Sequence, residues 1–259
     1  MSTQQVPVKS IANFLNAPST SKFLQETLSE KKAEFVSNLI ALCDSDNNLA
    51  QCDPSQLMKC AMNATSLNLP LNKNLGYAYV IAYKGIPSFQ IGYKGLIQLA
   101  IRTGQYKFIN ATEIREGEIR HNKITGEVIF NGEKPDAPIV GYMSYLELVN
   151  GFTASLYMTE EQLEQHAVRF SQTYKNDKQY GKSTSKWSDP LARPTMCKKT
   201  VLKLLLGTYG LMTTEFAKAL DSDNDDEVSN SGHRFEEAEI VSQGEPTEEQ
   251  SDEPKRMEI

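Results

Sequence analysis

The sequence contains few of the residues on which metal sites and disulfide frameworks depend. Its 259 residues include three histidines, one tryptophan and four cysteines, which are Cys43, Cys52, Cys60 and Cys197. No two cysteines form a CxxC pair, and no histidine lies near the first three. This spacing argues against a zinc site. We expect reduced thiols, as in a cytoplasmic protein.

Long apolar runs are also missing. No stretch approaches the roughly 18 apolar residues that a transmembrane helix needs. The first ten residues, MSTQQVPVKS, lack the apolar segment of a signal peptide. We therefore expect a protein that is neither secreted nor membrane-spanning.

Motifs of common catalytic sites are absent as well. The sequence has no G-x-S-x-G elbow, no G-x-G-x-x-G fingerprint and no histidine motif of a metalloprotease or nuclease. Gly181-Lys182-Ser183 ends like a phosphate-binding loop, but Asn176 stands where its first glycine should be, and no strand is expected before it. We expect no ATP site, no metal site and no enzymatic activity.

Charge is unevenly distributed along the chain. The whole sequence has 33 acidic and 27 basic residues, a net charge of −6. Residues 221–259 hold 14 of the acids and 3 of the bases, which leaves 19 acids and 24 bases in residues 1–220. A mildly basic body, net +5, thus precedes an acidic tail, net −11. The tail lacks apolar periodicity, and we expect it to be disordered.

Apolar periodicity predicts an α+β fold with an antiparallel sheet or meander packed against helices. A long amphipathic helix is expected over 20–43, and Asp53-Pro54-Ser55-Gln56 begins a second helix that runs to about Leu67. The segments 1–70, 71–220 and 221–259 are interpreted as a helical N-terminal region for packing or oligomerisation, an α+β core and the tail.

Short β-rich runs begin after Gly76. Turns are expected at Gly85-Ile86-Pro87, at 123–126 and at Asn150-Gly151, and a helix between the runs should end at Gly104. Further helices are expected after a capping box at 159–162 and over 195–206. The polar segment 171–186 has little periodicity and is interpreted as a mobile loop.

Cations gather between Arg169 and Lys203. This stretch holds nine basic residues and only two acids, and Phe170, Tyr174, Tyr180 and Trp187 are interleaved among them. Cations beside aromatic rings are typical of single-stranded nucleic-acid binding. The alternative is a solvated basic loop whose aromatic side chains pack inward. For Trp187, stacking on a base and packing in the core both stay open.

Two helices are expected to present cations on one side. In the helix over 195–206, Cys197, Val201, Leu204 and Leu205 should face the core, while Lys199 and Lys203 should point away from it together. Lys94, Gln98 and Arg102 should stack along one side of the earlier helix. The residues assigned to DNA phosphates are Lys94, Arg102, Lys107, Lys182, Lys186, Arg193, Lys198, Lys199 and Lys203.

Three segments, "SLNLPLNKNLGYAYVIAYKG", "FQIGYKGLIQLAIRTGQY" and "MCKKT", resemble the RecT family of phage and prophage single-strand annealing proteins. The resemblance covers about residues 35–220. Tyr93, Lys94 and Gly95 match one family motif, and Trp187, Met196, Lys198, Lys199 and Thr200 match another. Tyr93 and Trp187 therefore join the candidate DNA-binding residues. The family commonly has more cations after the lysine–threonine pair, where this sequence has Leu202 and Leu204.

The resemblance implies ATP-independent annealing of complementary DNA strands in a bacterial host cell, by rings or helical filaments that work with a phage 5′→3′ exonuclease. It also implies a sheet-and-helix core that lines a basic groove. We expect single-stranded DNA to be held by its phosphates, with no cofactor; an effect of magnesium on annealing is left open. The tail is expected to bind the exonuclease or the host single-strand-binding protein, or to discourage self-association; the alternative is a disordered tail that only solubilises the protein. The alternatives are a non-annealing single-strand-binding protein, a nuclease and an RNA chaperone.

Overall fold

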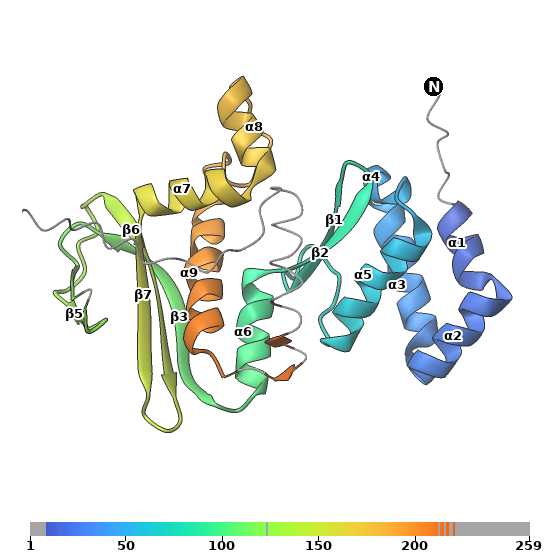
Figure 1. Cartoon of the computed structure of the whole chain (residues 1–259), viewed down its shortest axis with the longest axis horizontal. Coiled ribbons are helices and arrows are strands. Elements are labelled where there is room, and N and C mark those ends of the chain that lie inside the picture. Colours follow the sequence, from blue (N-terminus) through green and yellow to red (C-terminus); the bar gives the residue numbers. More distant parts are fainter. Residues whose placement is uncertain (1–8, 123, 212, 215, 218–219, 221–259) are drawn as a thin grey trace, which may run out of the picture.

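The computed structural model describes residues 9–122, 124–211, 213–214, 216–217 and 220. Helices of the N-terminal region lie at one end of the molecule and a three-stranded sheet at the other, with a β-hairpin and the helices Tyr93–Arg102 and Arg193–Tyr209 between them (Figure 1). This arrangement confirms the expected α+β class with antiparallel strands. The acidic tail lies outside the described residues.

The N-terminal region consists of helices, as expected. They are α1 (Lys9–Asn16), α2 (Pro18–Leu28), α3 (Lys32–Asp44), α4 (Asn47–Ala50) and α5 (Pro54–Ser66). The single helix expected over 20–43 is wrong, because Ser29 takes a positive φ of 48° and begins the short 3-10 turn η1 (Ser29–Lys31). The start of α5 is confirmed: the Asp53 carboxylate accepts a hydrogen bond from the Gln56 amide at 3.0 Å.

A two-stranded hairpin follows, formed by β1 (Ala78–Tyr83) and β2 (Ile86–Ile91). Its turn is Lys84-Gly85, one residue earlier than expected, and Ile86 and Pro87 already belong to β2. Both turn residues have positive φ, 52° and 85°, which matches the twist of a two-residue hairpin. Helix α6 (Tyr93–Arg102) comes next, and Gly104, at φ 68°, lies just beyond its end as predicted.

The larger sheet has the order β3-β6-β7, and both of its pairings are antiparallel. Its strands are β3 (Tyr106–Arg115), β6 (Ile139–Leu148) and β7 (Thr153–Thr159), while β4 (Ile119–His121) and β5 (Val128–Phe130) form a small side hairpin. The predicted turn at Asn150-Gly151 is confirmed, with Gly151 at φ 87°. Gly126, in the other predicted turn, also has a positive φ, of 72°.

Three helices complete the described fold: α7 (Glu160–Phe170), α8 (Gln172–Tyr180) and α9 (Arg193–Tyr209). Thr159 and Gln162 form the predicted capping box of α7. The loop expected over 171–186 is wrong in its first half, because Ser171 caps α8 and Gly181 ends it in the left-handed conformation. Polar sequence hid this helix, since local caps rather than an apolar face define it.

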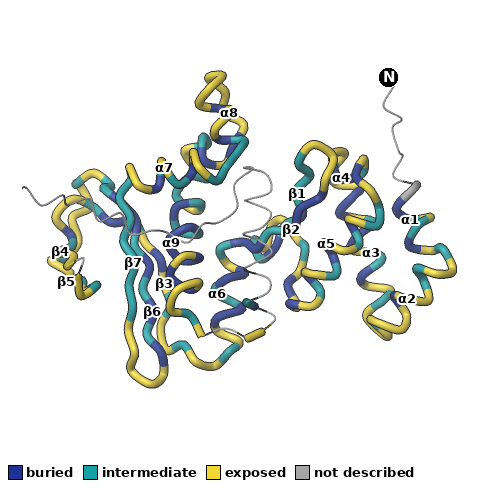
Figure 2. The backbone as a smooth tube through the Cα atoms, in the orientation of Figure 1, coloured by how far each residue is buried: buried dark blue, intermediate teal, exposed yellow. Residues whose placement is uncertain are grey.

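Helix α9 occupies the centre of the molecule and packs on the three-stranded sheet. Leu202 and Leu205 have no exposed area, and the Ser144 hydroxyl on β6 donates to the Val201 carbonyl at 2.7 Å. Figure 2 shows buried backbone along α9 and the middle of the sheet, and mostly exposed backbone along α2 and α8. The helix is longer than the predicted 195–206, and its buried residues run from Cys197 to Leu206.

Candidate nucleic-acid interface

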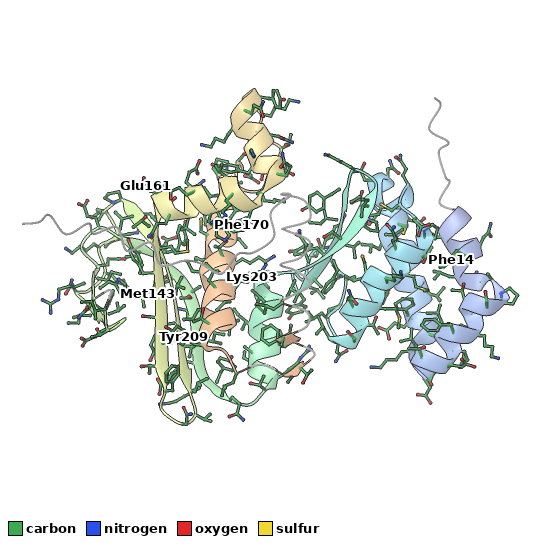
Figure 3. All side chains as sticks on the ribbon, viewed as in Figure 1. Phe14, Met143, Glu161, Phe170, Lys203 and Tyr209 are labelled. Carbon is green, nitrogen blue, oxygen red and sulfur yellow. The ribbon has the colours of Figure 1, made fainter. Side chains whose placement is uncertain are left out.

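A groove of about 1800 Å³ lies between the β1–β2 hairpin and the helices α7 and α9. Its walls come from segments far apart in sequence: β1 and β2, the start of α6, the second half of α7, residues 184–187 and α9. Figure 3 shows Lys203 and Phe170 on the side of α9 and α7 that faces the hairpin. Tertiary packing therefore gathers a surface that no single sequence segment contains.

One side of the groove is cationic. The basic residues on this side, which come from α7, residues 184–187 and α9, are Arg169, Lys186, Lys199 and Lys203; a fifth, Lys73, lies elsewhere in the lining. The one acid among the described lining residues is Asp46, and its carboxylate pairs with the Lys73 ammonium at 2.8 Å. The lining therefore carries five positive charges and one negative charge, net +4. A concave surface with this charge attracts a polyanion.

Lys203 lies deeper in the groove than the sequence predicted. The helix pattern put it on a side pointing away from the core, yet only 8% of its surface is exposed, while the supposedly core-facing Leu204 is 37% exposed. The expected orientation of these two residues is wrong. Leu202 and Leu206 are fully buried, and Lys203 borders the groove with its Nζ atom buried.

His166 lies beside Lys203 in the groove lining. Burial, followed by the positive charges of Lys203 and Arg169, lowers the pKa of its imidazole to about 4. Its Nδ1 atom is buried and has no hydrogen-bond partner among the described residues. The ring contacts Phe170, with centroids 4.6 Å apart. The imidazole is thus neutral at pH 7 and sits where an added negative charge would favour its protonation.

The opposite side of the groove is aromatic. Tyr79, Ile81 and Tyr83 alternate along β1, and all three line the groove together with Tyr93 at the start of α6. Successive residues of a strand point to opposite faces, so these three share one face. On the other face Ala78 and Val80 are buried, and Val80 and Ala82 also border the groove. The Gln90 amide on β2 donates to the Tyr83 hydroxyl at 3.2 Å.

The predicted site residues are only partly brought together. Five of the eleven line the groove: Tyr93, Lys186, Trp187, Lys199 and Lys203. The other six, which are absent from the lining, are Lys94, Arg102, Lys107, Lys182, Arg193 and Lys198. The single channel that the sequence suggested therefore contains fewer of these cations than expected, and it gains Lys73 and Arg169. DNA binding by each of the eleven stays a prediction.

Several of the outlying cations have partners within the chain. Arg102 donates to the carbonyls of Leu67 and Asn68 at 2.7 and 3.1 Å, which ties α6 to the end of α5. Lys107 pairs with Glu147 across β3 and β6 at 2.7 Å. Each contact links two elements of the fold. Arg102 and Lys107 therefore bind acceptors of the chain itself and do not line the groove.

Arg193 belongs to a network that joins α7, α8 and α9. Its guanidinium contacts Glu160 at 2.9 Å and Glu164 at 3.0 Å. Glu164 also accepts from the Lys178 ammonium at 2.6 Å and from the Tyr174 hydroxyl. Burial alone would raise the pKa of Glu164, but the hydrogen bonds from Lys178, Tyr174 and Arg193 outweigh it and hold the pKa at about 2.

Trp187 packs in the core. Only 5% of its surface is exposed, and its ring lies 6.3 Å from that of Tyr174, centroid to centroid. It borders the groove but belongs to the main hydrophobic cluster. Of the two alternatives left open by the sequence, the structure favours core packing.

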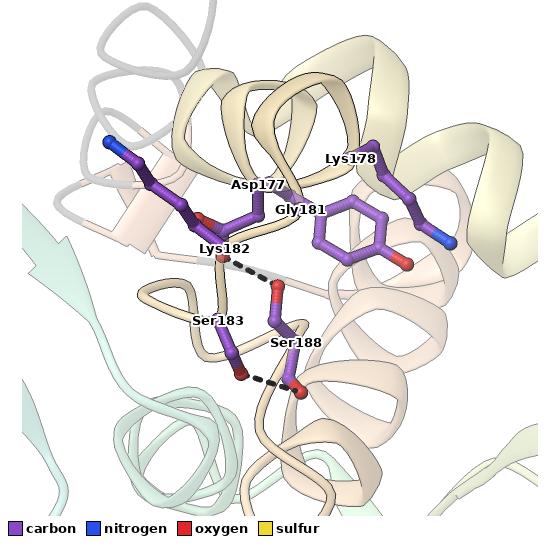
Figure 4. Close-up of a pocket in the computed structure, with 7 residues that line it drawn as sticks. Asp177, Lys178, Gly181, Lys182, Ser183 and Ser188 are labelled. Atoms are coloured by element: carbon purple, nitrogen blue, oxygen red, sulfur yellow. Dashed lines mark hydrogen bonds between the residues drawn. The ribbon is translucent and has the colours of Figure 1, made fainter.

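Asp177 organises the segment that carries Lys186 and Trp187. Its buried carboxylate accepts hydrogen bonds from the Thr184 amide and hydroxyl (2.8 and 2.6 Å), from the Ser185 amide (2.7 Å) and from the Ser188 hydroxyl (2.6 Å). Burial opposes the charge, yet these hydrogen bonds hold the pKa of Asp177 well below its usual range. Figure 4 shows Asp177, Lys182 and Ser188 around a small pocket at this turn.

The sequence contained one signal for this role, because Asp177 is one of only two acids in the basic stretch. An isolated acid among cations suggests a specific partner, but its hydrogen-bond donors could not be identified without the fold. The turn that they form places residues 184–187 in the wall of the groove.

Neither metal binding nor a membrane span is indicated by the described residues. They contain no group of three or more His, Cys, Asp or Glu side chains that could hold a metal ion. No helix among them is both long and apolar enough to cross a membrane. All four cysteines are buried and free of disulfides, and burial raises the pKa of Cys43 to about 11 and of Cys197 to about 12.

A large groove with a net positive charge is the surface expected of a nucleic-acid-binding protein. Comparison with known families identifies the class more closely: the RecT family matches residues 33–241, and the chain belongs to this family. The resemblance seen in the sequence is thereby confirmed, and the match reaches beyond its expected end at 220. Membership implies single-strand annealing in recombination, binding of single-stranded DNA and oligomerisation.

Two curated relatives cover most of the chain. The chain is 35% identical over 265 residues to "Uncharacterized protein YqaK" of Bacillus subtilis (strain 168), with 98% of this chain and 88% of that protein covered. It is 27% identical over 229 residues to "Protein RecT" of Escherichia coli (strain K12), with 82% and 80% covered. The proteins of this family are annealing proteins rather than classical enzymes.

Proposed function

We propose that the groove between the β1–β2 hairpin and helices α7 and α9 holds single-stranded DNA and lets it anneal to a complementary strand without ATP. The observation that carries this proposal is the net charge of +4 in one groove, assembled from four separate segments of the chain. Phosphates are the part of a DNA strand that such a surface can hold without regard to sequence.

Annealing sets a further requirement that a cationic groove meets. Base edges held by the protein could not pair with a second strand, so the first strand must be gripped by its backbone. The same cations would then hold the nascent duplex, whose phosphates are twice as numerous. Binding is therefore expected to be independent of sequence and sensitive to salt.

Four net charges in one subunit make a short contact, and we propose that oligomers join the grooves into a continuous track. A ring or filament would add the contacts of neighbouring subunits on one strand and make binding cooperative. The helical region before residue 71 offers the surfaces on which subunits could meet. No nucleotide or metal cofactor is required in this scheme, although magnesium could change the annealing rate by screening phosphates.

The test compares two neighbouring lysines of α9. Lys199 lines the groove and Lys198 does not, although both are half-buried on the same helix. Replacing each by Gln removes one charge and keeps most of the side chain. We expect Lys199→Gln to slow annealing of complementary oligonucleotides, with and without magnesium and in the absence of ATP, while Lys198→Gln stays near the parental rate.

Equal rates for the two variants would refute the groove assignment. Normal DNA binding without acceleration of pairing by the parental protein would instead identify a non-annealing single-strand-binding protein. Degradation of the labelled strands would indicate a nuclease, and a preference for RNA strands an RNA chaperone.

The acidic segment 221–259 is proposed to recruit partners in the bacterial cytoplasm, namely a phage 5′→3′ exonuclease and the host single-strand-binding protein. Its net charge of −11 would repel phosphates, so a direct role in holding DNA is not expected. Binding of purified candidates to the full chain and to a chain ending at Leu220 tests this role.

A further inference from the structure

We propose that the two walls of the groove divide the strand between them: bases stack on the tyrosine face of β1, and phosphates lie against the cations of α7, α9 and residues 184–187. This inference rests on the proposed binding of single-stranded DNA in the groove. It adds which wall receives which part of the nucleotide and names Tyr79 as a base-stacking residue.

The β1 wall is built for flat, apolar contacts. Tyr79, Ile81 and Tyr83 follow one another at every second position, so they stand about 7 Å apart along the strand. All three are half-buried, and none of them carries a charge. Ala78 and Val80 on the other face of the strand are 0% and 2% exposed and pack in the main hydrophobic cluster, which anchors the strand.

Glycines hold the Tyr79 ring in its position. A methyl group added at Gly92 would stand 3.0 Å from a ring carbon of Tyr79, and one at Gly76 would stand 3.3 Å from its hydroxyl. The ring therefore packs against backbone at the base of the hairpin and borders the groove. Aromatic rings fixed in this way offer a π-face to any base, whatever its identity.

The facing wall carries the cations, although Phe170 and the buried Trp187 also border the groove there. Arg169, Lys186, Lys199 and Lys203 come from α7, the Asp177-centred turn and α9, and none of them lies on the hairpin. The one charged pair elsewhere in the lining, Lys73 with Asp46, is neutral as a whole. Phosphates thus have attractive partners on one wall only, and a strand in the groove turns its bases to the other.

This division suits annealing. Stacking uses the face of a base and leaves its Watson–Crick edge uncovered, so a bound strand stays readable by its complement. Bases held by stacking are also ordered in a row, which lowers the entropy that pairing must still remove. The groove would then present a strand rather than merely coat it.

The test is a thermodynamic cycle with two ligands and the full chain. One ligand is an oligothymidylate, and the other is an abasic oligonucleotide of equal length with the same phosphates but no bases. We expect the parental protein to bind the first more tightly. Tyr79→Ala should weaken binding of oligothymidylate by about five- to a hundredfold, the range for loss of one base–aromatic stack, and leave the abasic ligand unchanged.

Three further variants make the result specific. Tyr79→Phe keeps the ring and should bind oligothymidylate like the parental protein. Tyr180→Ala removes a tyrosine that is 64% exposed and outside the groove lining, and should change neither affinity. Lys199→Gln should weaken both ligands by the same factor, because both carry phosphates. If thermal denaturation shows that Tyr79→Ala unfolds, Tyr79→Leu keeps apolar bulk without a π-face and takes its place.

An equal loss on both ligands for Tyr79→Ala, or no loss on either, would overturn the assignment of bases to β1. The proposed function fails in a different way, namely by a Lys199→Gln variant that binds both ligands like the parental protein. The two failures are therefore distinguishable in one set of titrations.

Discussion

The groove charge predicts how steeply DNA affinity should fall with salt. Each phosphate contact on a single strand contributes a slope of about −0.7 to the plot of log K against log salt concentration. The net charge of +4 in the groove therefore predicts a slope of about −2.8 per bound subunit. Between 50 and 200 mM salt, the affinity should fall about 50-fold.

Removing two charges should halve this dependence. In the double variant Lys186→Gln/Lys199→Gln the expected slope is about −1.4, which gives a fall of about sevenfold over the same range. Fluorescence anisotropy with a labelled oligothymidylate measures both slopes. The control is Lys59→Gln/Lys198→Gln, which removes two lysines that do not line the groove and keeps the same net charge as the test variant.

Equal slopes in the test and control variants would refute the reasoning, because they would show that the bound phosphates do not contact the groove. A parental slope near zero would exclude phosphate binding as the main source of affinity. A lower affinity with an unchanged slope would mean that the lysines act through the fold, and thermal denaturation would show this independently.

Further predictions concern groups around the groove. Because the pKa of His166 is about 4 and a nearby phosphate would raise it, DNA affinity should increase as pH falls from 6.5 towards 4, and His166→Gln should remove this pH dependence in anisotropy titrations. Glu164 has a folded pKa of about 2, below its ordinary 4.5, so its contribution to stability is complete above pH 4.5 and is lost as pH falls towards 2. In the Glu164→Gln variant, the melting temperature should therefore depend less on pH between 4.5 and 2. Asp177→Asn should loosen residues 184–188, seen as a red shift and easier acrylamide quenching of Trp187, the only tryptophan; unchanged emission would contradict its role. A chain ending at Leu220 should anneal purified strands at the parental rate, and a large loss would show that the acidic segment acts on DNA directly.

Local patterns identified much of the fold. The cap at Asp53, the capping box at Thr159 and the turn at Gly151 depend on side-chain chemistry within three or four residues, so each could be predicted from a short window. The secondary-structure prediction was wrong where a local break interrupts an apolar pattern and where a helix has no apolar pattern. The break at Ser29 divides a periodic stretch, and the polar helix α8 is defined by its caps.

The sequence by itself determined the family, the α+β class and the presence of a basic stretch beside aromatic residues, because these depend on residue identity and short spacing. Only the tertiary structure decided which cations share a surface. Arg102, Lys107 and Arg193 bind acceptors that are distant in sequence, while Lys73 and Arg169 reach the groove through packing. Whether a lysine meets a carboxylate or an open groove depends on which elements pack against its own, and no local pattern contains that information.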